Sequence, residues 1–149
     1  MEEPKISIII ADDNREFDNI LNDCFSMQND MVVAGIAVNG VEALKLVKGK
    51  KPDLIILDII MPILDGLGVL EEINTINLEP MPRIIVLSAV GNDKIAQRAI
   101  SLGADYYILK PFDIEVLIKK IRQMLNSTIG GSTHIKKALI CNDNADIKA

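Results

Sequence analysis

The stretch between Pro52 and Pro62 constrains the fold more than any other part of the chain. Four aliphatic residues, Leu54 to Leu57, precede Asp58 without a polar interruption. Such a continuous apolar run is typical of a short strand buried on both faces, as in parallel sheets. Asp58 then lies at the carboxyl end of the strand, where open α/β sheets bind ligands. The run therefore predicts a parallel sheet with a carboxylate at its functional edge.

Strand-like and helix-like segments alternate along the chain. Aliphatic and β-branched runs predict strands at 6–11, 31–36, 54–57, 84–87 and 106–109, and apolar residues at helical spacing predict a helix after each strand. This alternation predicts an α/β fold: a flavodoxin-like, doubly wound (βα)5 parallel sheet with the strand order 2-1-3-4-5. In that order the sheet grows in one direction from strand one to strand two and in the opposite direction from strand three onward, so the topological switch point lies between strands one and three.

We expect one ordered domain over residues 1–126. A chain of 149 residues with 49% hydrophobic residues fills one core and is too short for two ordinary domains. Residues 127–133 read Ser-Thr-Ile-Gly-Gly-Ser-Thr, which is the composition of a flexible linker. The apolar residues at 135–140 would form one or two helical turns, which are marginal in water. Residues 127–149 are therefore expected to be a flexible linker.

Composition and charge exclude several classes of function. The net charge is −5, so the chain taken whole has no basic footprint for nucleic acid. No apolar run approaches the ~20 residues of a membrane span, and the acidic N-terminus is unlike a signal peptide. Cys24 and Cys141 have no spacing typical of zinc sites or disulfide frameworks. These features predict a soluble, cytoplasmic protein that does not enter the membrane.

Four of the five predicted strands end on polar residues, which are Asp12 with Asp13, Asp58, Ser88 and Lys110. Taken singly, each could be a turn, a helix cap or a surface residue. Taken together, they should converge at one edge of the sheet. Three carboxylates there would repel one another unless they share a cation, and Mg²⁺, for which Mn²⁺ or Ca²⁺ could substitute, suits oxygen ligands. With a lysine and a hydroxyl, the set fits phosphoryl transfer to a carboxylate.

The motifs at these strand ends resemble the receiver domain of bacterial two-component response regulators, over residues ~5 to ~126. They are Ala11-Asp12-Asp13-Asn14, Asp58-Ile59-Ile60-Met61-Pro62 with Asp65-Gly66, Ser88-Ala89, and Tyr107-Ile108-Leu109-Lys110-Pro111. The resemblance implies that Asp58 accepts a phosphoryl group from the phosphohistidine of a histidine kinase or histidine phosphotransferase. It also implies that Asp13, Asp58 and the Ile60 carbonyl hold Mg²⁺, with Asp12 nearby.

The resemblance implies roles for three further residues. Lys110 would bind a phosphoryl oxygen, next to a peptide bond to Pro111 that is usually cis in the family. Ser88 would be the switch hydroxyl and Tyr107 the switch aromatic, which would rotate inward, although Tyr107 is also a common strand residue. Such a domain promotes its own phosphorylation and slow dephosphorylation, and it is not an enzyme acting on a separate substrate.

A narrower resemblance is to the receivers of the stage-zero sporulation regulators of endospore-forming Firmicutes. It rests on Asp12 to Glu16, on Asp58 to Pro62 with Leu64 to Leu67, and on Ile108 to Asp113. It implies a transcription regulator that binds DNA through a C-terminal effector domain absent from this chain, and that forms a homodimer on phosphorylation. A stand-alone phosphorelay receiver without DNA-binding output is the alternative.

Two other classes share parts of this pattern. Haloacid-dehalogenase-type phosphatases also use an aspartyl phosphate and Mg²⁺, but their nucleophile follows the first strand, whereas Asp58 follows the third. Flavodoxin-type modules share the topology, but Asp12 and Asp13 would repel a bound phosphate at the first loop. The sequence therefore favours a receiver over both.

Overall fold

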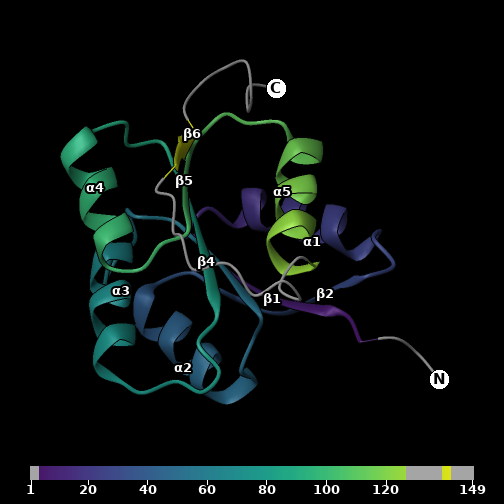
Figure 1. Ribbon diagram of the computed structural model, residues 1–149, viewed down its shortest axis with the longest axis horizontal. Helices are drawn as coiled ribbons and strands as arrows, with labels where there is room; N and C mark the ends of the chain where they lie inside the picture. The colour runs from purple at the N-terminus through teal and green to yellow at the C-terminus, as the bar shows by residue number, and fades with distance from the viewer. Residues whose placement is uncertain (1–3, 127–138, 142–149) are drawn as a thin grey trace.

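The computed structural model describes residues 4–126 and 139–141 and shows one parallel sheet between two layers of helices (Figure 1). The strands are β1 Ile6–Ala11, β2 Met31–Ala37, β3 Leu54–Leu57, β4 Arg83–Ser88, β5 Tyr106–Leu109 and β6 Leu139–Cys141. The helices are α1 Arg15–Ser26, α2 Gly40–Lys50, α3 Gly66–Thr75, α4 Asp93–Ser101 and α5 Ile114–Asn126. Within these described ranges, no helix has the length and hydropathy needed to cross a membrane.

The first five strands run parallel in the order 2-1-3-4-5, so the predicted doubly wound fold is confirmed. Helices α1 and α5 cover one face of the sheet, and α2, α3 and α4 cover the other. Because successive side chains of a strand point to opposite faces, β3 supplies both cores. Ile55 and Leu57 pack with the α2–α4 layer, while Leu54 and Ile56 pack with α1 and α5.

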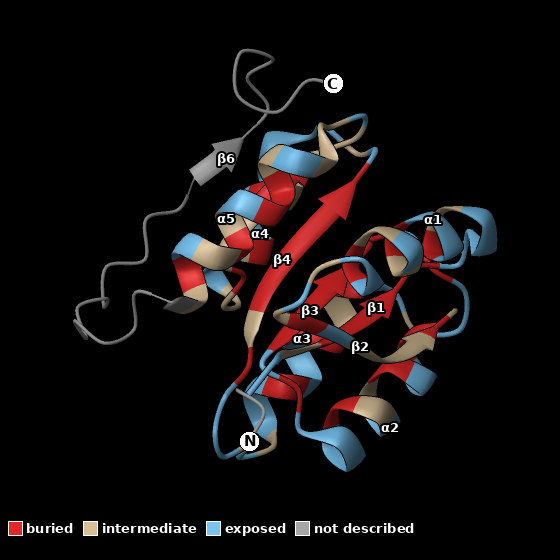
Figure 2. Cartoon of the chain, turned by 90° about the vertical axis from the view of Figure 1, so that its right-hand side faces the viewer, coloured by how far each residue is buried: buried red, intermediate tan, exposed pale blue. Residues whose placement is uncertain are grey.

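The central strands are buried on both faces, as the apolar runs predicted. Figure 2 shows β4 buried along nearly its whole length, whereas the helices expose their outer faces. All four residues of β3 are at most 2% exposed. Burying one such aliphatic side chain contributes roughly 1.5–3 kcal/mol, so the sheet is a rigid support for the loops at its carboxyl edge.

Side-chain caps fix where four helices begin, and the cap of α4 is Asn92, which accepts from the N–H groups of Lys94 and Ile95. Asn14, Asn39 and Asp65 each accept a hydrogen bond from the backbone N–H three residues later, at 3.1, 2.9 and 2.8 Å. Such caps satisfy backbone donors that a helix start otherwise leaves free. Asn14 and Asn39 closely follow the ends of β1 and β2, so these two βα connections stay short, whereas Asp65 lies eight positions after the end of β3.

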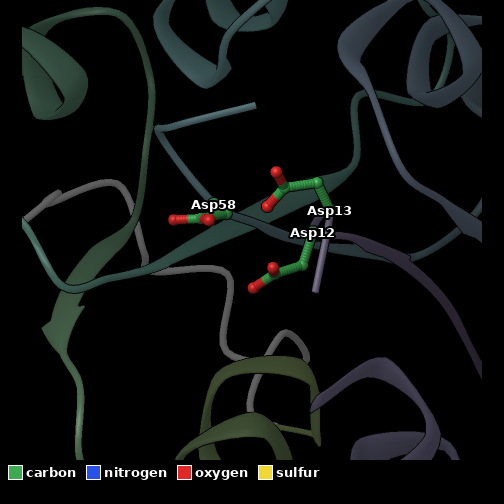
Figure 3. Close-up of side chains that lie close together, drawn as sticks. All are labelled: Asp12, Asp13 and Asp58. Carbon is green, nitrogen blue, oxygen red and sulfur yellow. The ribbon is translucent and has the colours of Figure 1, made fainter. Parts of the chain in front are cut away.

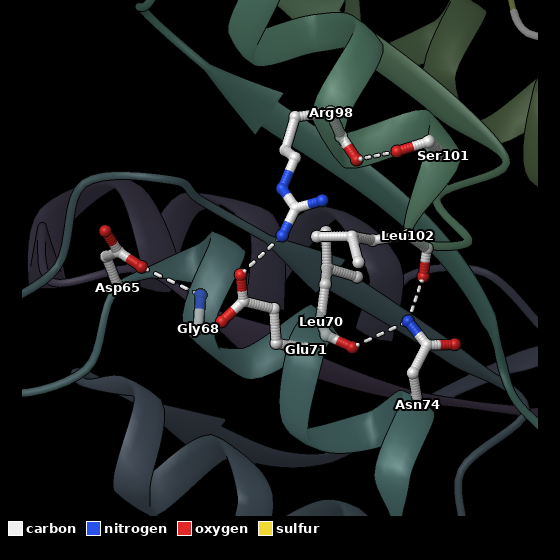
Figure 4. A network of polar contacts seen from close by, with 8 residues as sticks. All are labelled: Asp65, Gly68, Leu70, Glu71, Asn74, Arg98, Ser101 and Leu102. Atoms are coloured by element: carbon white, nitrogen blue, oxygen red, sulfur yellow. Dashed lines mark hydrogen bonds and ion pairs between the residues drawn. The ribbon is translucent and has the colours of Figure 1, made fainter.

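Polar contacts join α4 to α3 (Figure 4). The Asn74 amide donates to the carbonyl oxygens of Leu70 and Leu102, at 3.0 and 2.6 Å. Arg98 pairs with Glu71 at 2.8 Å, but both side chains are 54% exposed, so the pair adds little stability. Helix α4 itself buries only two alanines. Helix α4 therefore has a thin apolar face, and polar contacts support it.

The sheet has a sixth strand that sequence analysis did not predict. Leu139–Cys141 forms β6, which pairs in parallel with β5 in the register Tyr106↔Leu139. Residues 139 and 140, at the end of the segment considered for helical turns, are extended, and residues 135–138 lie outside the described residues. The rest of the expected linker, 127–138 and 142–149, lies outside the described residues, so the division at residue 126 stays a prediction.

Candidate functional site

The ends of β1 and β3 place three carboxylates together. Ala11 and Leu57 are partners in the β1–β3 register, so the residues that follow leave the sheet side by side. The Asp58 N–H donates to the Ala11 carbonyl oxygen at 2.9 Å. One carboxylate oxygen from each of Asp12, Asp13 and Asp58 lies within 4.8 Å of the others (Figure 3). The structure thus brings together the three acids that the strand order placed at this edge.

Asp58 is a buried carboxylate with a raised pKa. The residue is only 8% exposed, and its Oδ1 accepts a hydrogen bond from the Ile59 N–H at 2.8 Å. Burial, and then the charge of Asp12, raise the pKa of Asp58 to about 6, while Lys110 acts in the opposite direction. A carboxyl with this pKa is mostly ionised at pH 7 and can act as a nucleophile.

Asp12 connects the start of α1 to Lys110. Its Oδ1 accepts from the Asn14 N–H at 2.9 Å, and its Oδ2 accepts from the Lys110 Nζ at 2.7 Å. Among the residues that the structure describes, the ion pair of Lys110 is with Asp12 and not with Asp58. The Lys110–Pro111 peptide bond is cis, as the resemblance implied. Lys110 therefore lies at the rim of the acidic cluster.

Ser88 and Tyr107 meet at the loop between β4 and α4. The Ser88 Oγ accepts from the Val90 N–H at 3.1 Å, and the Tyr107 hydroxyl donates to the Val90 carbonyl oxygen at 2.7 Å. Burial raises the pKa of Tyr107, whose residue is 1% exposed. The structure holds the Tyr107 ring inside the core. Its role as a switch aromatic stays a prediction.

Sequence analysis missed one acidic residue at the site. Asp18 is 1% exposed, and neither of its carboxylate oxygens has a hydrogen-bond partner. Burial, followed by the charge of Asp12, raises the pKa of Asp18 to about 7, and Lys110 counteracts the shift. The helical spacing after the first strand predicts Ile20 on the apolar face of α1, but Ile20 is 56% exposed. The spacing of Asp18, Leu21 and Phe25, the buried residues of α1, is the signal that would have identified Asp18.

The acidic cluster has the chemistry of a divalent-cation site. Short carboxylate side chains with oxygens this close suit a hard cation such as Mg²⁺, which keeps several waters and takes further ligands from a phosphate. Ile60 follows two residues after Asp58 and is 59% exposed. The role of the Ile60 carbonyl oxygen as a further Mg²⁺ ligand stays a prediction.

Comparison with known proteins decides the family. The family model of the response regulator receiver domain matches residues 8–122, which include every buried residue of the two core clusters except Met124. The chain belongs to the response regulator receiver domain family. Receiver domains bind Mg²⁺ at an acidic pocket and interact with histidine kinases or phosphotransferases. They promote their own phosphorylation and dephosphorylation, and are generally not true enzymes.

Solved structures of receivers support this assignment. The response regulator domain of Thermotoga maritima CheB is 32% identical, with a TM-score of 0.73, and the match covers 82% of this chain and 97% of that chain. A DNA-binding response regulator of the LuxR family from Staphylococcus aureus is 30% identical, with a TM-score of 0.74 and coverages of 79% and 97%. CheY in the Borrelia burgdorferi CheX–CheY–BeF3–Mg²⁺ complex matches at 25% identity and a TM-score of 0.72, with coverages of 81% and 90%.

Proposed function

We propose that this receiver accepts a phosphoryl group on Asp58 from the phosphohistidine of a histidine kinase or histidine phosphotransferase. The observation that carries the proposal is the position of Asp58 at the end of β3, where its carboxylate lies within 4.8 Å of those of Asp12 and Asp13. Lys110, bonded to Asp12, adds a cation at the same rim. Acids and a lysine around one ionised carboxylate are what phosphoryl transfer to that carboxylate requires.

The chemistry follows from these positions. An Asp58 carboxylate oxygen forms a bond to phosphorus while the bond from phosphorus to the histidine nitrogen breaks, and the imidazole leaves with its electron pair. Asp12, Asp13, Asp58 and the Ile60 carbonyl would hold Mg²⁺, which supplies charge neutralisation during the transfer. Lys110 binds a phosphoryl oxygen, and the Ser88 hydroxyl turns from Val90 to donate to another.

A narrower proposal concerns the regulator to which this receiver belongs. The motifs from Asp12 to Glu16, from Asp58 to Pro62 with Leu64 to Leu67, and from Ile108 to Asp113 support a sporulation transcription regulator that binds DNA through a separate effector domain. Among the similar structures, the one from S. aureus is that of a DNA-binding response regulator, which supports the DNA-binding part of this proposal. The stand-alone phosphorelay receiver is the other candidate, and the coding sequence beyond Ala149 distinguishes the two.

We also propose that phosphorylation promotes a two-fold dimer through α4, β5 and α5. Asp93, Lys94, Gln97, Arg98 and Lys119 are exposed there and carry charges of both signs, which suits a self-complementary contact. Arg122 lies outside the apolar stripe of α5 and was expected to take part as well. It donates to both carboxylate oxygens of Asp30, at 2.9 and 3.0 Å, and to Gln28. Arg122 therefore ties α5 to the loop before β2, as Arg98 is tied to α3 by Glu71, and both would exchange these partners in the proposed contact.

The test is transfer from a phosphohistidine-bearing protein donor in the presence of Mg²⁺. We expect label to pass to this chain and EDTA to stop the transfer, because the acidic cluster needs a cation before it accepts a phosphoryl group. Asp13→Asn, which removes one carboxylate ligand, should need at least about tenfold more Mg²⁺ for half-maximal transfer. Equal transfer with and without a divalent cation would contradict the proposal.

A further inference from the structure

Lys110 is held by an aromatic ring as well as by Asp12. The Lys110 Nζ lies 4.2 Å from the centroid of the Phe17 ring, on the first turn of α1. An ammonium group within ~6 Å of a ring centroid is attracted by the negative face of the ring. The same nitrogen is 2.7 Å from Asp12 Oδ2. Two contacts from different directions thus define one position for the ammonium group.

The ring itself is fixed from two sides. The Asn14 cap accepts a hydrogen bond from the Phe17 N–H at 3.1 Å, which sets the backbone that carries the ring. Phe112 packs edge-on against Phe17, with centroids 6.0 Å apart and an interplanar angle of 83°. Since Phe112 is two residues after Lys110, the lysine and its ring support come from the same loop after β5.

The lysine needs such a support. The Lys110 side chain is 22% exposed, so its flexible stem has a route to solvent. The buried carboxylate of Asp18, the next residue after Phe17, adds negative charge that interacts with Lys110 but has no hydrogen-bond partner of its own. The attraction from Asp18 has no hydrogen bond to direct it, whereas the ring face of Phe17 restricts where the ammonium group lies.

We propose that Phe17 is a positioning residue for Lys110, and that its ring face holds the ammonium group at the rim of the acidic cluster, ready for a phosphoryl oxygen. The contact of Phe17 with Lys110 is independent of the function of the site. Its consequence for phosphorylation rests on the proposed function. Phe112 contributes by holding the Phe17 ring upright.

The contact is tested by NMR in the absence of any phosphoryl donor. Protons above a ring face shift upfield, so the ε-methylene protons of Lys110 should show a ring-current shift in the wild-type protein. Phe17→Leu should remove the shift, and Phe17→Tyr, which keeps the ring face, should retain it. Tyr106→Leu is the matched control, because it removes a second lysine–ring contact, Lys120 over Tyr106 at 5.2 Å, away from the cluster. Absence of the shift in the wild type, or its persistence in Phe17→Leu, would overturn the proposal.

The consequence is tested by phosphorylation with acetyl phosphate and Mg²⁺. Because the lysine contacts the phosphoryl group both before and during transfer, losing its position should weaken binding more than it slows the transfer step. We expect Phe17→Leu to raise the half-saturating donor concentration about three- to tenfold, with the maximal rate within about twofold. Phe17→Tyr and Tyr106→Leu should match the wild type. Unchanged half-saturation in Phe17→Leu would overturn the positioning role. An unphosphorylated wild type would instead contradict the proposed function, and the NMR result would still decide the contact.

Discussion

Asp18 is a buried carboxyl group whose environment disfavours the ionised form. A carboxylate that is 1% exposed and has no hydrogen-bond partner is costly to keep ionised. Its pKa of about 7 means that near neutral pH the folded protein holds a proton that the unfolded chain releases near pH 4. The folded state therefore loses stability as pH rises from about 4 to about 7, and the loss levels off above that range.

Asp18→Asn should remove this part of the pH dependence. We expect the variant to increase the free energy of unfolding by about 2–4 kcal/mol at pH 8 and by much less at pH 4.5, because Asn carries no charge at either pH. Urea unfolding at the two pH values measures the effect. In the Asp18→Asn variant the free energy of unfolding should still fall as pH rises, with a smaller slope, because Asp58 also has a raised pKa of about 6. Asp23→Asn, on the exposed face of the same helix, is the control, and an equal gain at both pH values for Asp18→Asn would contradict the assignment.

The strand-end residues could be located from sequence because strand order and register bring them together. Asp12, Asp58 and Lys110 each follow a buried strand, so the topology alone places them at one edge. Asp18 and the role of Phe17 could not be located in this way. The apolar spacing of α1 identifies Phe17 and Leu21, which pack against or within the core, but a carboxylate between them gives no apolar signal, so Asp18 is not identified.

The connection between β3 and α3 is the tightest element at the site. A Cβ added at Gly66 would lie 2.2 Å from the Asp58 carbonyl oxygen and 2.8 Å from the Ile59 Cα. Ile63, in the same connection, has a φ of 72°, and the Leu64 N–H donates to the Pro62 carbonyl oxygen at 2.7 Å, which forms a γ-turn. A β-branched residue in this conformation is strained. The loop that carries Asp58 and Ile60 is therefore tightly packed and has no space for an added side-chain atom at Gly66.

Gly66→Ala and Gly49→Ala should have opposite effects. Gly66→Ala forces the backbone of Asp58 to move, so we expect a loss of at least about 2 kcal/mol in the free energy of unfolding and weaker Mg²⁺ binding. Gly49 lies in α2, and a methyl group added there would have no atom within 4 Å, so Gly49→Ala should add roughly 0.5–1 kcal/mol. Thermal unfolding with and without Mg²⁺ measures both variants. A Gly66→Ala protein as stable as the wild type would show that the connection relaxes freely.

The helix starts and the first five strands could be predicted because caps and apolar runs act locally. Asn14, Asn39 and Asp65 cap their helices through neighbouring backbone groups, which a sequence displays directly. The three residues of β6 could not be identified, because a strand this short has no period of its own. Its conformation comes from pairing with β5, a contact more than 30 positions away in the chain.

The sixth strand bears on how the receiver assembles. β6 pairs along the outer edge of β5, between α4 and α5, which is part of the proposed dimer contact (Figure 1). We expect a chain shortened to residues 1–126 to dimerise more tightly when phosphorylated than the full chain, because β6 no longer competes for that edge. Sedimentation of both phosphorylated chains measures the difference, and Lys119→Glu should weaken both dimers. A phosphorylated chain that stays monomeric in both forms would contradict the dimer.

The central claim is that Asp58 is the phosphoryl acceptor, and intact mass after treatment with acetyl phosphate and Mg²⁺ tests it most directly. We expect one adduct of about 80 Da on the wild type, the mass of a single phosphoryl group, and none on Asp58→Asn. Asp65→Asn, which changes an acid in the same connection and keeps an α3 cap, should still gain the adduct. An adduct of the same size and yield on Asp58→Asn would contradict the account.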